Sequence, residues 1–207
     1  MYIKDMSKKS AKDKILEIAK KLILEKGYSN TNIRDITYLA NVSVGTLYHH
    51  FKKGKIDLLK EIIVKSTIEF SEDLNSQNFF ADKEINNFSD GLNTYLLALI
   101  ENHRKNRLFL AAMESEVLSN ISFYDKLKND IRSKEARQIE TNLFFKPIKT
   151  LLEKFPQEDL KFEGKEKHIH RIVDTLIHRH IYDEYTFESD EYFLQLLNKI
   201  ILALSKD

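Results

Sequence analysis

The stretch "NVSVGTLYHHFKKGK", residues 41–55, decides how the amino-terminal part of this chain folds. It opens with a tight turn, after which Ser43 is placed to cap a short helix that ends near His50. Leu47 is the residue of this helix that points into a core, and Phe51 closes that core beneath it. The remaining side chains are small, polar or aromatic, so the sequence predicts a helix whose outer face makes contacts with a partner.

Two helices are predicted on the amino-terminal side of this stretch. The first runs from about Ser10 to Lys26 and ends at Gly27, where a left-handed residue is favoured. Its apolar residues recur at helical spacing, at Ile15, Ile18, Ala19, Leu22 and Ile23. The second helix starts at Asn32, an expected cap, and has a short apolar face at Ile33, Ile36 and Ala40. Two short helices joined by a tight turn, with a third helix packed behind them, predict a helix-turn-helix.

The second helix of a helix-turn-helix presents its first residues to the major groove of DNA. Gly45 lets the backbone approach DNA closely, and Thr46 offers a hydroxyl and a methyl group to base edges. The lysines that follow neutralise phosphates, which adds affinity without sequence information. The predicted DNA-binding residues are Thr31, Asn32, Arg34, Ser43, Val44, Gly45, Thr46, Tyr48, His49, Lys52, Lys53 and Lys55.

The charge distribution agrees with a DNA-binding amino-terminal part. Residues 1–65 hold 14 basic and 7 acidic residues, a net charge of +7, whereas the remainder has a net charge of −6. A basic segment on an acidic body favours a polyanionic partner, although a solvated lysine-rich surface is an open alternative. The lysines before residue 15 fit either an arm on DNA or a solvated tail.

Composition excludes several other classes of protein. The chain has 207 residues, 42% of them apolar, which suffices for one or two domains with a core. The chain lacks cysteine, so disulfides and cysteine-based metal sites are excluded. Its amino terminus is polar, unlike a secretory signal. No apolar run approaches the ~18 residues of a membrane span. We therefore expect a soluble cytoplasmic, nucleoid-associated protein without membrane contact.

No motif indicates an enzyme or a cofactor. The five glycines are isolated, so no phosphate-binding loop is formed, and no nucleophile elbow occurs. The segment "HIHRIVDTLIHRH" contains His168, His170, His178 and His180. Residues two apart on a helix are about 200° apart around its axis, so neither close pair shares a face. We expect no catalytic residue, no cofactor and no metal site, with these histidines on a surface or dimer face.

The rest of the chain has helical periodicity throughout. Long helices are predicted at about 55–75, 84–103, 105–118, 122–154, 164–183 and 189–205. Pro147 lies inside one of these patterns, which predicts a kink or a break there. With only 5 glycines and 2 prolines, and no sustained alternation typical of strands, the fold class is all-α with about nine helices.

The segment "ILEIAKKLILEKGYSNTNIRDITYLANVSVGTLYHHFKKGKIDLL" resembles the DNA-binding head of the tetracycline-repressor (TetR) family of regulators. The matching pieces are the apolar stripe and Gly-Tyr of the first helix, "NIRDI", "VSVGTLYHHF" and a lysine that opens the fourth helix. Thr37 and Asn41 depart from the alanine and glycine usual in the family. The resemblance implies that Ser43, Gly45, Thr46, Tyr48 and His49 face DNA, and that Asn32, Lys52 and Lys55 contact phosphates.

The resemblance also implies two domains. Residues 1–54 form the helix-turn-helix domain, with an arm at about 1–9, and residues 55–207 form a ligand-binding and dimerisation domain. Residues expected at a homodimer interface on the last two helices are Ile172, Leu176, Tyr192, Leu196, Ile200 and Leu204. A monomeric core is the alternative for these helices. Expected pocket residues are Tyr95, Leu96, Leu99, Ile100, Phe109, Met113, Val117, Phe123, Phe144, Phe145 and Ile148, for which plain core packing is the alternative.

The function expected from the sequence is a ligand-responsive, sequence-specific transcriptional regulator. A repressor is expected that leaves a pseudo-palindromic operator in double-stranded DNA when a small hydrophobic or amphipathic effector binds, for example a fatty acyl-CoA. A non-regulatory DNA-binding protein of the same fold, such as a nucleoid or division factor, is the alternative.

Overall fold

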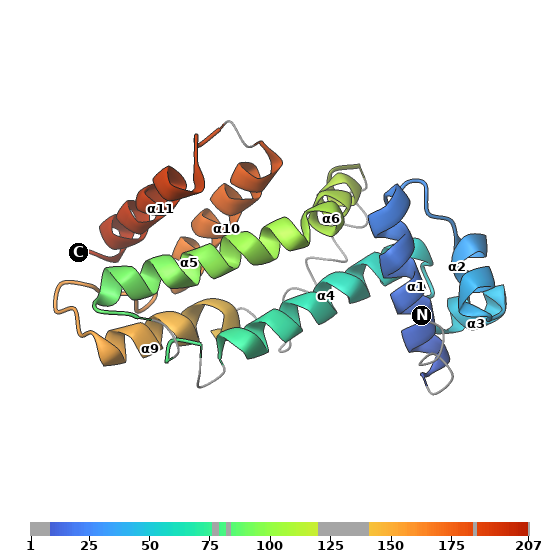
Figure 1. Cartoon of the computed structure of the whole chain (residues 1–207), viewed down its shortest axis with the longest axis horizontal. Helices are drawn as coiled ribbons and strands as arrows, with labels where there is room; N and C mark the ends of the chain where they lie inside the picture. Colours follow the sequence, from blue (N-terminus) through green and yellow to red (C-terminus); the bar gives the residue numbers. More distant parts are fainter. Residues whose placement is uncertain (1–8, 76–78, 82–83, 120–140, 184–185, 207) are drawn as a thin grey trace. The chain divides into compact units, whose positions relative to one another are not determined.

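The computed structural model describes residues 9–75, 79–81, 84–119, 141–183 and 186–206. Helices account for all regular structure within these ranges, and no strand occurs in them, so the expected all-α class is confirmed. None of the helices searched there is long and apolar enough to cross a membrane. The helices, shown in Figure 1, are α1 (Ala11–Lys26), α2 (Ile33–Ala40), α3 (Val44–His50), α4 (Lys55–Leu74), α5 (Phe88–Lys105), α6 (Arg107–Ser119), the π-helical turn η2 (Thr141–Phe145), α9 (Lys146–Lys154), α10 (Glu166–Tyr182) and α11 (Asp190–Ser205).

Helix boundaries follow the capping residues. Ser10, Asn32 and Ser43 each accept a hydrogen bond from a backbone N–H in the first turn of the helix that follows. The helix predicted from about residue 84 begins later, because Asn87 caps α5. Of the helix predicted over 122–154, residues 122–140 lie outside the described ranges.

Pro147 lies at a change of helix type, in agreement with the predicted kink or break. The π-helical turn η2 ends at Phe145, and α9 begins at Lys146 with Pro147 in its first turn. Proline is tolerated there because the first N–H groups of an α-helix have no partner within the helix.

Packing divides the chain into two compact units. We call the described residues of Met1–Ser66 and Leu108–Asp125 the head, and those of Thr67–Arg107 and Lys126–Asp207 the body. The long helix α4 continues through the border between them. The domain border predicted after residue 54 remains a prediction, and by packing the first turns of α4 belong with the head.

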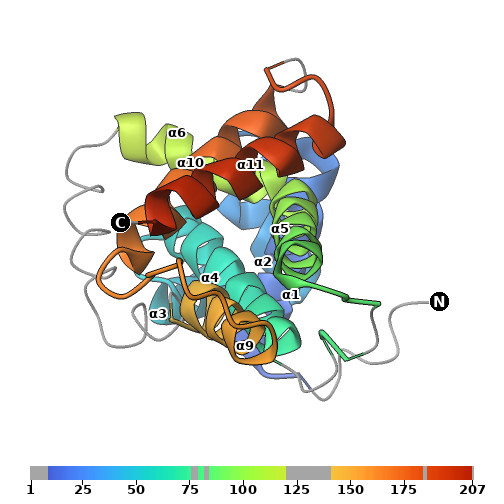
Figure 2. The same cartoon turned by 90° about the vertical axis from the view of Figure 1, so that its left-hand side faces the viewer.

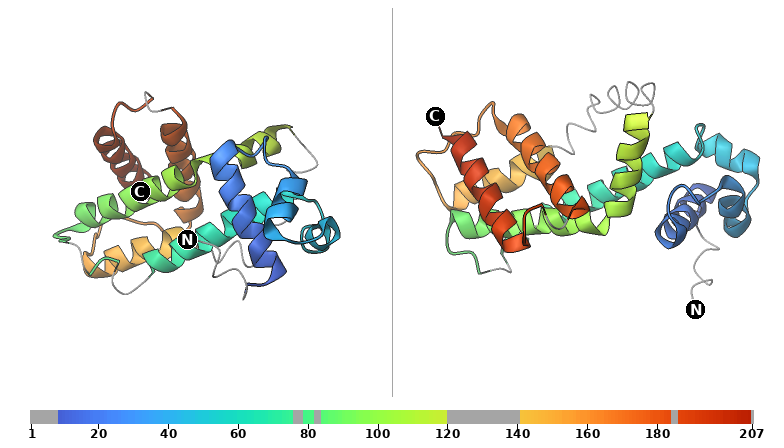
Figure 3. Two further views of the ribbon diagram at one scale, coloured as in Figure 1. Left: turned by 45° about the vertical axis from the view of Figure 1, so that its right-hand side comes forward. Right: turned by 90° about the horizontal axis from the view of Figure 1, so that it is seen from above.

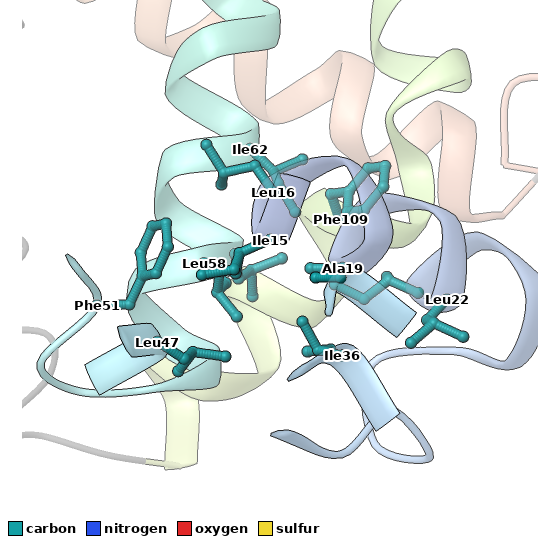
Figure 4. Packing of buried hydrophobic residues seen from close by; sticks show 13 residues of the cluster. Ile15, Leu16, Ala19, Leu22, Ile36, Leu47, Phe51, Leu58, Ile62 and Phe109 are labelled. Atoms are coloured by element: carbon teal, nitrogen blue, oxygen red, sulfur yellow. The ribbon is translucent and has the colours of Figure 1, made fainter. Parts of the chain in front are cut away.

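The head is built on one hydrophobic core, shown in Figure 4. Ile15, Ala19 and Ile36 from α1 and α2 are fully or almost fully buried, as the apolar stripes predict. Leu47 of α3 and Phe51 just after it enter the same core. Leu58, Leu59 and Ile62 of α4 and Phe109 of α6 complete it, together with further residues of α1 and α2. Because the core spans five helices, α3 is held from behind while its other face stays outside.

In the body, α5 is the central helix and contacts α9, α10 and α11 (Figure 2). Gly91 of α5 permits a close approach to α9, because a Cβ atom at this position would collide with the side chain of Leu151. The buried hydroxyl of Tyr95 donates a hydrogen bond of 2.6 Å to the carbonyl oxygen of Leu143. Both views in Figure 3 show α10 and α11 as neighbours, and these two helices are in contact.

Candidate nucleic-acid interface

The amino terminus of α3 is fixed by its own polar side chains. The hydroxyl of Ser43 accepts a hydrogen bond of 2.9 Å from the backbone N–H of Thr46 and lies 2.8 Å from the hydroxyl of Thr46. Ahead of this cap, Asn41 takes the left-handed conformation with φ of 52°, which asparagine adopts more readily than most residues. Contacts within the chain thus define the conformation of the turn between α2 and α3.

The outer face of α3 is solvent-exposed along its length. Val44, Gly45, Tyr48 and His49 are exposed, and 45% of Tyr48 is accessible. A Cβ atom at Gly45 would meet only the Ser43 hydroxyl, at an ordinary contact distance of 3.5 Å, so packing within the described residues does not require glycine there. The exposed backbone at Gly45 carries no side chain that would keep a partner at a distance.

Tyr48 is partly supported by the loop that follows α3. Gly54 has φ of +65°, and a Cβ atom on it would lie 3.5 Å from the Tyr48 ring and 2.9 Å from Ile33. The tyrosine ring therefore rests beside Gly54 with its outer part in solvent. Lys52 and Lys53, in the same loop, are exposed. The exposed face of α3 therefore includes the partly supported ring of Tyr48, and Lys52 and Lys53 lie next to it.

The start of α2 has a second exposed face. Asn32 caps α2, accepting from the N–H of Asp35 at 2.8 Å, and Arg34 is exposed. Tyr38 lies one helical turn after Arg34 and is 84% exposed. Sequence reasoning missed Tyr38, although its i+4 spacing from Arg34 and its place just before the turn were signals that could have found it.

Two predicted DNA contacts need correction. Thr31 is only 1% exposed, and its hydroxyl donates a hydrogen bond of 2.8 Å to the carbonyl oxygen of Gly27, so this side chain fastens the loop between α1 and α2. Lys55 is turned inward, and its ammonium group donates to the carbonyl oxygen of Tyr28 at 2.8 Å and lies 4.4 Å from the centre of that ring.

The pair of Lys55 and Tyr28 has the electrostatics of an internal contact. Burial lowers the pKa of Lys55, opposed by the charge of Glu116. Burial, assisted by Glu116, raises the pKa of Tyr28 to about 12. The cationic surface next to α3 therefore consists of Lys52 and Lys53, with Lys55 tied to the head's own structure.

An exposed, capped helix with a cationic border, held from behind by a hydrophobic core, is the geometry of a helix-turn-helix reader of DNA. Residues 15–62 match the family described as "Bacterial regulatory proteins, tetR family". The head of this chain therefore resembles the DNA-binding domain of the TetR family. The matched residues cover α1, α2, α3 and the part of α4 that packs in the head.

Similarity to individual TetR-family proteins is strongest in the head. The chain is 46% identical over 52 residues to the HTH-type transcriptional regulator QacR of Staphylococcus aureus. That match covers 25% of this chain and 27% of QacR, so it spans about a quarter of that relative's length.

Similarity over the whole length is one of fold. The chain resembles the fatty acid degradation regulator FadR from Bacillus halodurans with a TM-score of 0.61 and 18% identity, covering 94% of this chain and 96% of that one. It also resembles FadR from Bacillus subtilis, solved in complex with stearoyl-CoA, with a TM-score of 0.55 and 19% identity over 94% and 97% of the two chains. The body therefore has the all-helical fold seen in TetR-family regulators.

The residues expected around a ligand pocket fall into two groups. Tyr95, Leu96, Leu99, Ile100, Phe144, Phe145 and Ile148 lie in the body, and all except Phe145 are buried. Phe109 and Met113 instead pack in the core of the head, which corrects their expected place in a chamber of the body. Val117 lies on α6 in the head as well, and Phe123 lies outside the described residues.

The residues expected at a dimer interface share a solvent-facing side of α10 and α11. Ile172, Tyr192 and Leu204 are exposed, and Leu176, Leu196 and Ile200 are partly exposed. The neighbouring stripes, with Val173 on α10 and Leu197 on α11, are fully buried. The structure thus separates one apolar side used for the core from a second apolar side left in solvent.

Proposed function

We propose that this protein is a ligand-responsive, sequence-specific DNA-binding transcriptional regulator that acts as a repressor. The observation that carries the proposal is the outer face of α3. Packing within the described residues does not require glycine at position 45. Tyr48 and His49 of this face are exposed, and the exposed Lys52 and Lys53 follow the helix. Side chains of these kinds on the second helix of a helix-turn-helix contact base edges and phosphates in the major groove.

Double-stranded DNA with a pseudo-palindromic operator is the proposed partner, bound by a homodimer. A two-fold dimer presents two copies of α3 to two half-sites. Support for the dimer comes from the solvent-facing apolar side of α10 and α11, where a row at i, i+4, i+8 and i+12 runs along α11 through Tyr192, Leu196, Ile200 and Leu204. Exposed apolar rows of this kind are covered by packing against a partner helix.

A hydrophobic or amphipathic molecule of the fatty acyl-CoA class is the proposed effector, and the body is its proposed binding domain. The apolar and aromatic side chains on α5, η2 and α9 supply suitable surroundings for an acyl chain. The stearoyl-CoA complex of the structurally similar FadR from Bacillus subtilis also supports this class. Ligand binding releases DNA because it favours a conformation of the body that lowers operator affinity.

DNA recognition is tested by selecting binding sites from genomic fragments with the full-length protein, followed by affinity measurements at several salt concentrations. We expect a two-fold-symmetric motif with half-sites about one helical turn apart, and affinity that falls steeply with salt. Tyr48→Ala should weaken binding to this motif at least tenfold. Leu118→Ala, which changes an exposed apolar residue of the head on α6, is the matched control and should bind normally.

Two outcomes would count against this function. Equal affinity for hundreds of unrelated sequences would favour a nucleoid or division factor of the same fold. A salt slope near zero would mean that the head does not bind DNA.

The effector is tested separately by titrating stearoyl-CoA and free coenzyme A into the protein–operator complex at fixed salt. Release by stearoyl-CoA but not by coenzyme A is expected, because the acyl chain supplies the apolar contact. Unchanged operator affinity with both compounds would reject the acyl-CoA class and leave DNA recognition standing.

A further inference from the structure

One histidine of α5 lies close to an aspartate and a histidine of α10 in the body. The Nε2 atom of His103 lies 3.1 Å from a carboxylate oxygen of Asp174, and the Nε2 atom of His178 lies 4.0 Å from the same oxygen. All three ligand atoms lie within 4.8 Å of one another. The two imidazole rings are 5.1 Å apart in an edge-to-face arrangement.

The local structure orients these groups as metal ligands. Nδ1 of His103 donates a hydrogen bond of 2.7 Å to the carbonyl oxygen of Leu99, because a carbonyl oxygen can only accept. This contact leaves Nε2 as the nitrogen that faces the cluster, which is the usual arrangement around a metal-bound histidine. Asp174 and His178 are four residues apart, so they lie on one face of α10.

Burial of the cluster also suits a metal ion. The side chains of His103 and His178 are 13% and 20% exposed, whereas that of Asp174 is 41% exposed and leaves a route for ions from solvent. Burial raises the pKa of Asp174, but the hydrogen bond from His103 and the charges of neighbouring histidines outweigh it and hold that pKa below its ordinary value.

We propose that His103, Asp174 and His178 form a binding site for a divalent transition-metal ion of the zinc type. Two imidazoles and one carboxylate are a common set of three protein ligands, with a fourth position open to water or a ligand. In a tetrahedral zinc site the ligand atoms are about 3.3 Å apart, so the His178 ring has to move inward by roughly 1 Å. The ion cross-links α5 to α10 and stabilises the body, independently of DNA binding.

The competing arrangement is a plain ion pair between His103 and Asp174 with His178 as a neighbour. Both arrangements use the same hydrogen bond to Leu99, so a measurement on the protein has to separate them. Only the metal site predicts saturable, stoichiometric binding that requires His178, because this ring lies too far from Asp174 for a hydrogen bond.

Zinc and cobalt binding to the tag-free, full-length protein tests the site. After treatment with a chelator, we expect one Zn²⁺ per chain by calorimetry, and Co²⁺ should give visible absorption bands that Zn²⁺ then removes. Saturation at 100-fold above Kd should raise Tm by about 5 °C, and Mg²⁺ should have no effect. Neither measurement involves DNA or an effector, so a failure here leaves the proposed function untouched.

Matched variants identify the ligands. His103→Gln and His178→Gln should each lower zinc affinity at least tenfold and abolish the cobalt bands, with the metal-free Tm showing whether each variant is folded. His168→Gln, which changes an exposed histidine of the same helix, should bind zinc normally. The proposal is overturned if the unaltered protein does not bind zinc, or if His178→Gln binds it normally. It is also overturned if His168→Gln loses as much zinc affinity as the two ligand variants. Each of these results would leave only the ion pair between His103 and Asp174.

Discussion

Gly45 lies on the outer face of α3 and Gly54 in the loop that follows this helix, and their surroundings differ. Gly45 sits in the helix with room for a Cβ atom, whereas Gly54 has a positive φ and Ile33 packed 2.9 Å from where a Cβ atom would be. The backbone conformation therefore explains Gly54, whereas Gly45 is explained only if the proposed DNA contact is correct. The sequence presents both simply as glycines near lysines.

Alanine substitutions should separate these two roles. Gly54→Ala should destabilise the head by about 1–3 kcal/mol, because it combines a left-handed backbone with a close contact. Gly45→Ala should leave the free energy of unfolding unchanged or raise it by up to about 1 kcal/mol, because alanine favours the helix. Urea unfolding measures both. If Gly45→Ala keeps full DNA affinity, the close approach of DNA at this residue is wrong.

Lysines near α3 should differ in the same way. Lys52→Ala should reduce the slope of log affinity against log salt concentration by about 1, because one phosphate contact is lost. Lys55→Ala should leave this slope unchanged and lower the stability of the head, because its ammonium group is bonded to Tyr28. DNA titrations between 50 and 200 mM salt, roughly the range used for such slopes, distinguish the two. A reduced slope in Lys55→Ala would restore its predicted phosphate contact.

At the scale of elements, close approach and charge determine how the helices of the body pack. Gly91 brings α5 against α9, and Asp190 links the start of α11 to both α5 and α10. The carboxylate of Asp190 accepts from Arg104 at 2.7 Å and lies 2.7 Å from Nε2 of His180. Both residues lie where helix faces meet, so their roles depend on partners far away in sequence.

Gly91→Ala should destabilise the body by about 1–3 kcal/mol, because its new methyl group collides with Leu151. In the double variant Gly91→Ala, Leu151→Ala the collision is absent, so the loss should be smaller than the sum of the two single losses. Chemical unfolding of the four proteins gives the coupling energy. If the two losses of stability are strictly additive, the new methyl group at position 91 does not collide with Leu151.

Acid should weaken the attachment of α11. The hydrogen bond from Arg104, assisted by His180, holds the pKa of Asp190 below its ordinary value of 3.8. A carboxyl group with a lowered pKa in the folded state contributes stability that is present above about pH 4 and lost as pH falls through the folded pKa. In Asp190→Asn this part of the pH dependence should be missing from urea unfolding measured between about pH 5 and 2. An identical pH profile in the variant would assign the acid sensitivity to other carboxylates.

In the whole molecule, DNA binding is proposed for the head, and dimerisation and ligand binding are proposed for the body. The head holds the matched TetR-family residues and the exposed face of α3, and the body holds the apolar side of α10 and α11 together with the histidine–aspartate cluster. Head residues Phe109 and Met113 come from α6, which lies far along the chain from α1, so the head is not a continuous stretch of sequence. A fragment ending at residue 54 lacks a large part of the head core.

Dimer formation is the prediction at this scale. Leu196→Glu places a charge in the middle of the apolar row on α11, so it should convert the dimer to a monomer and weaken operator binding by at least tenfold. Light scattering after size-exclusion chromatography measures the mass. Lys199→Glu, an exposed residue on the same helix, is the control for the added charge. A monomeric unaltered protein at micromolar concentration would contradict the proposed two-fold assembly.

The linear pattern of residues is enough to predict the features that depend on local interactions. Apolar spacing, capping residues and a turn asparagine predicted α1, α2 and α3 almost to the residue, because these signals act within one helical turn. The same periodicity predicted the all-α class, and the row on α10 and α11 predicted for a dimer is indeed solvent-facing.

Contacts between residues far apart in the sequence become visible only in the folded chain. Thr31 and Lys55 were expected to contact DNA and instead bond to the head, because burial and partners across a loop do not show in a linear pattern. The cluster of His103, Asp174 and His178 is not visible in the sequence, because packing between α5 and α10 brings these residues together. The contact between His103 and Asp174 joins residues 71 positions apart, so it has no short-range signal in the sequence.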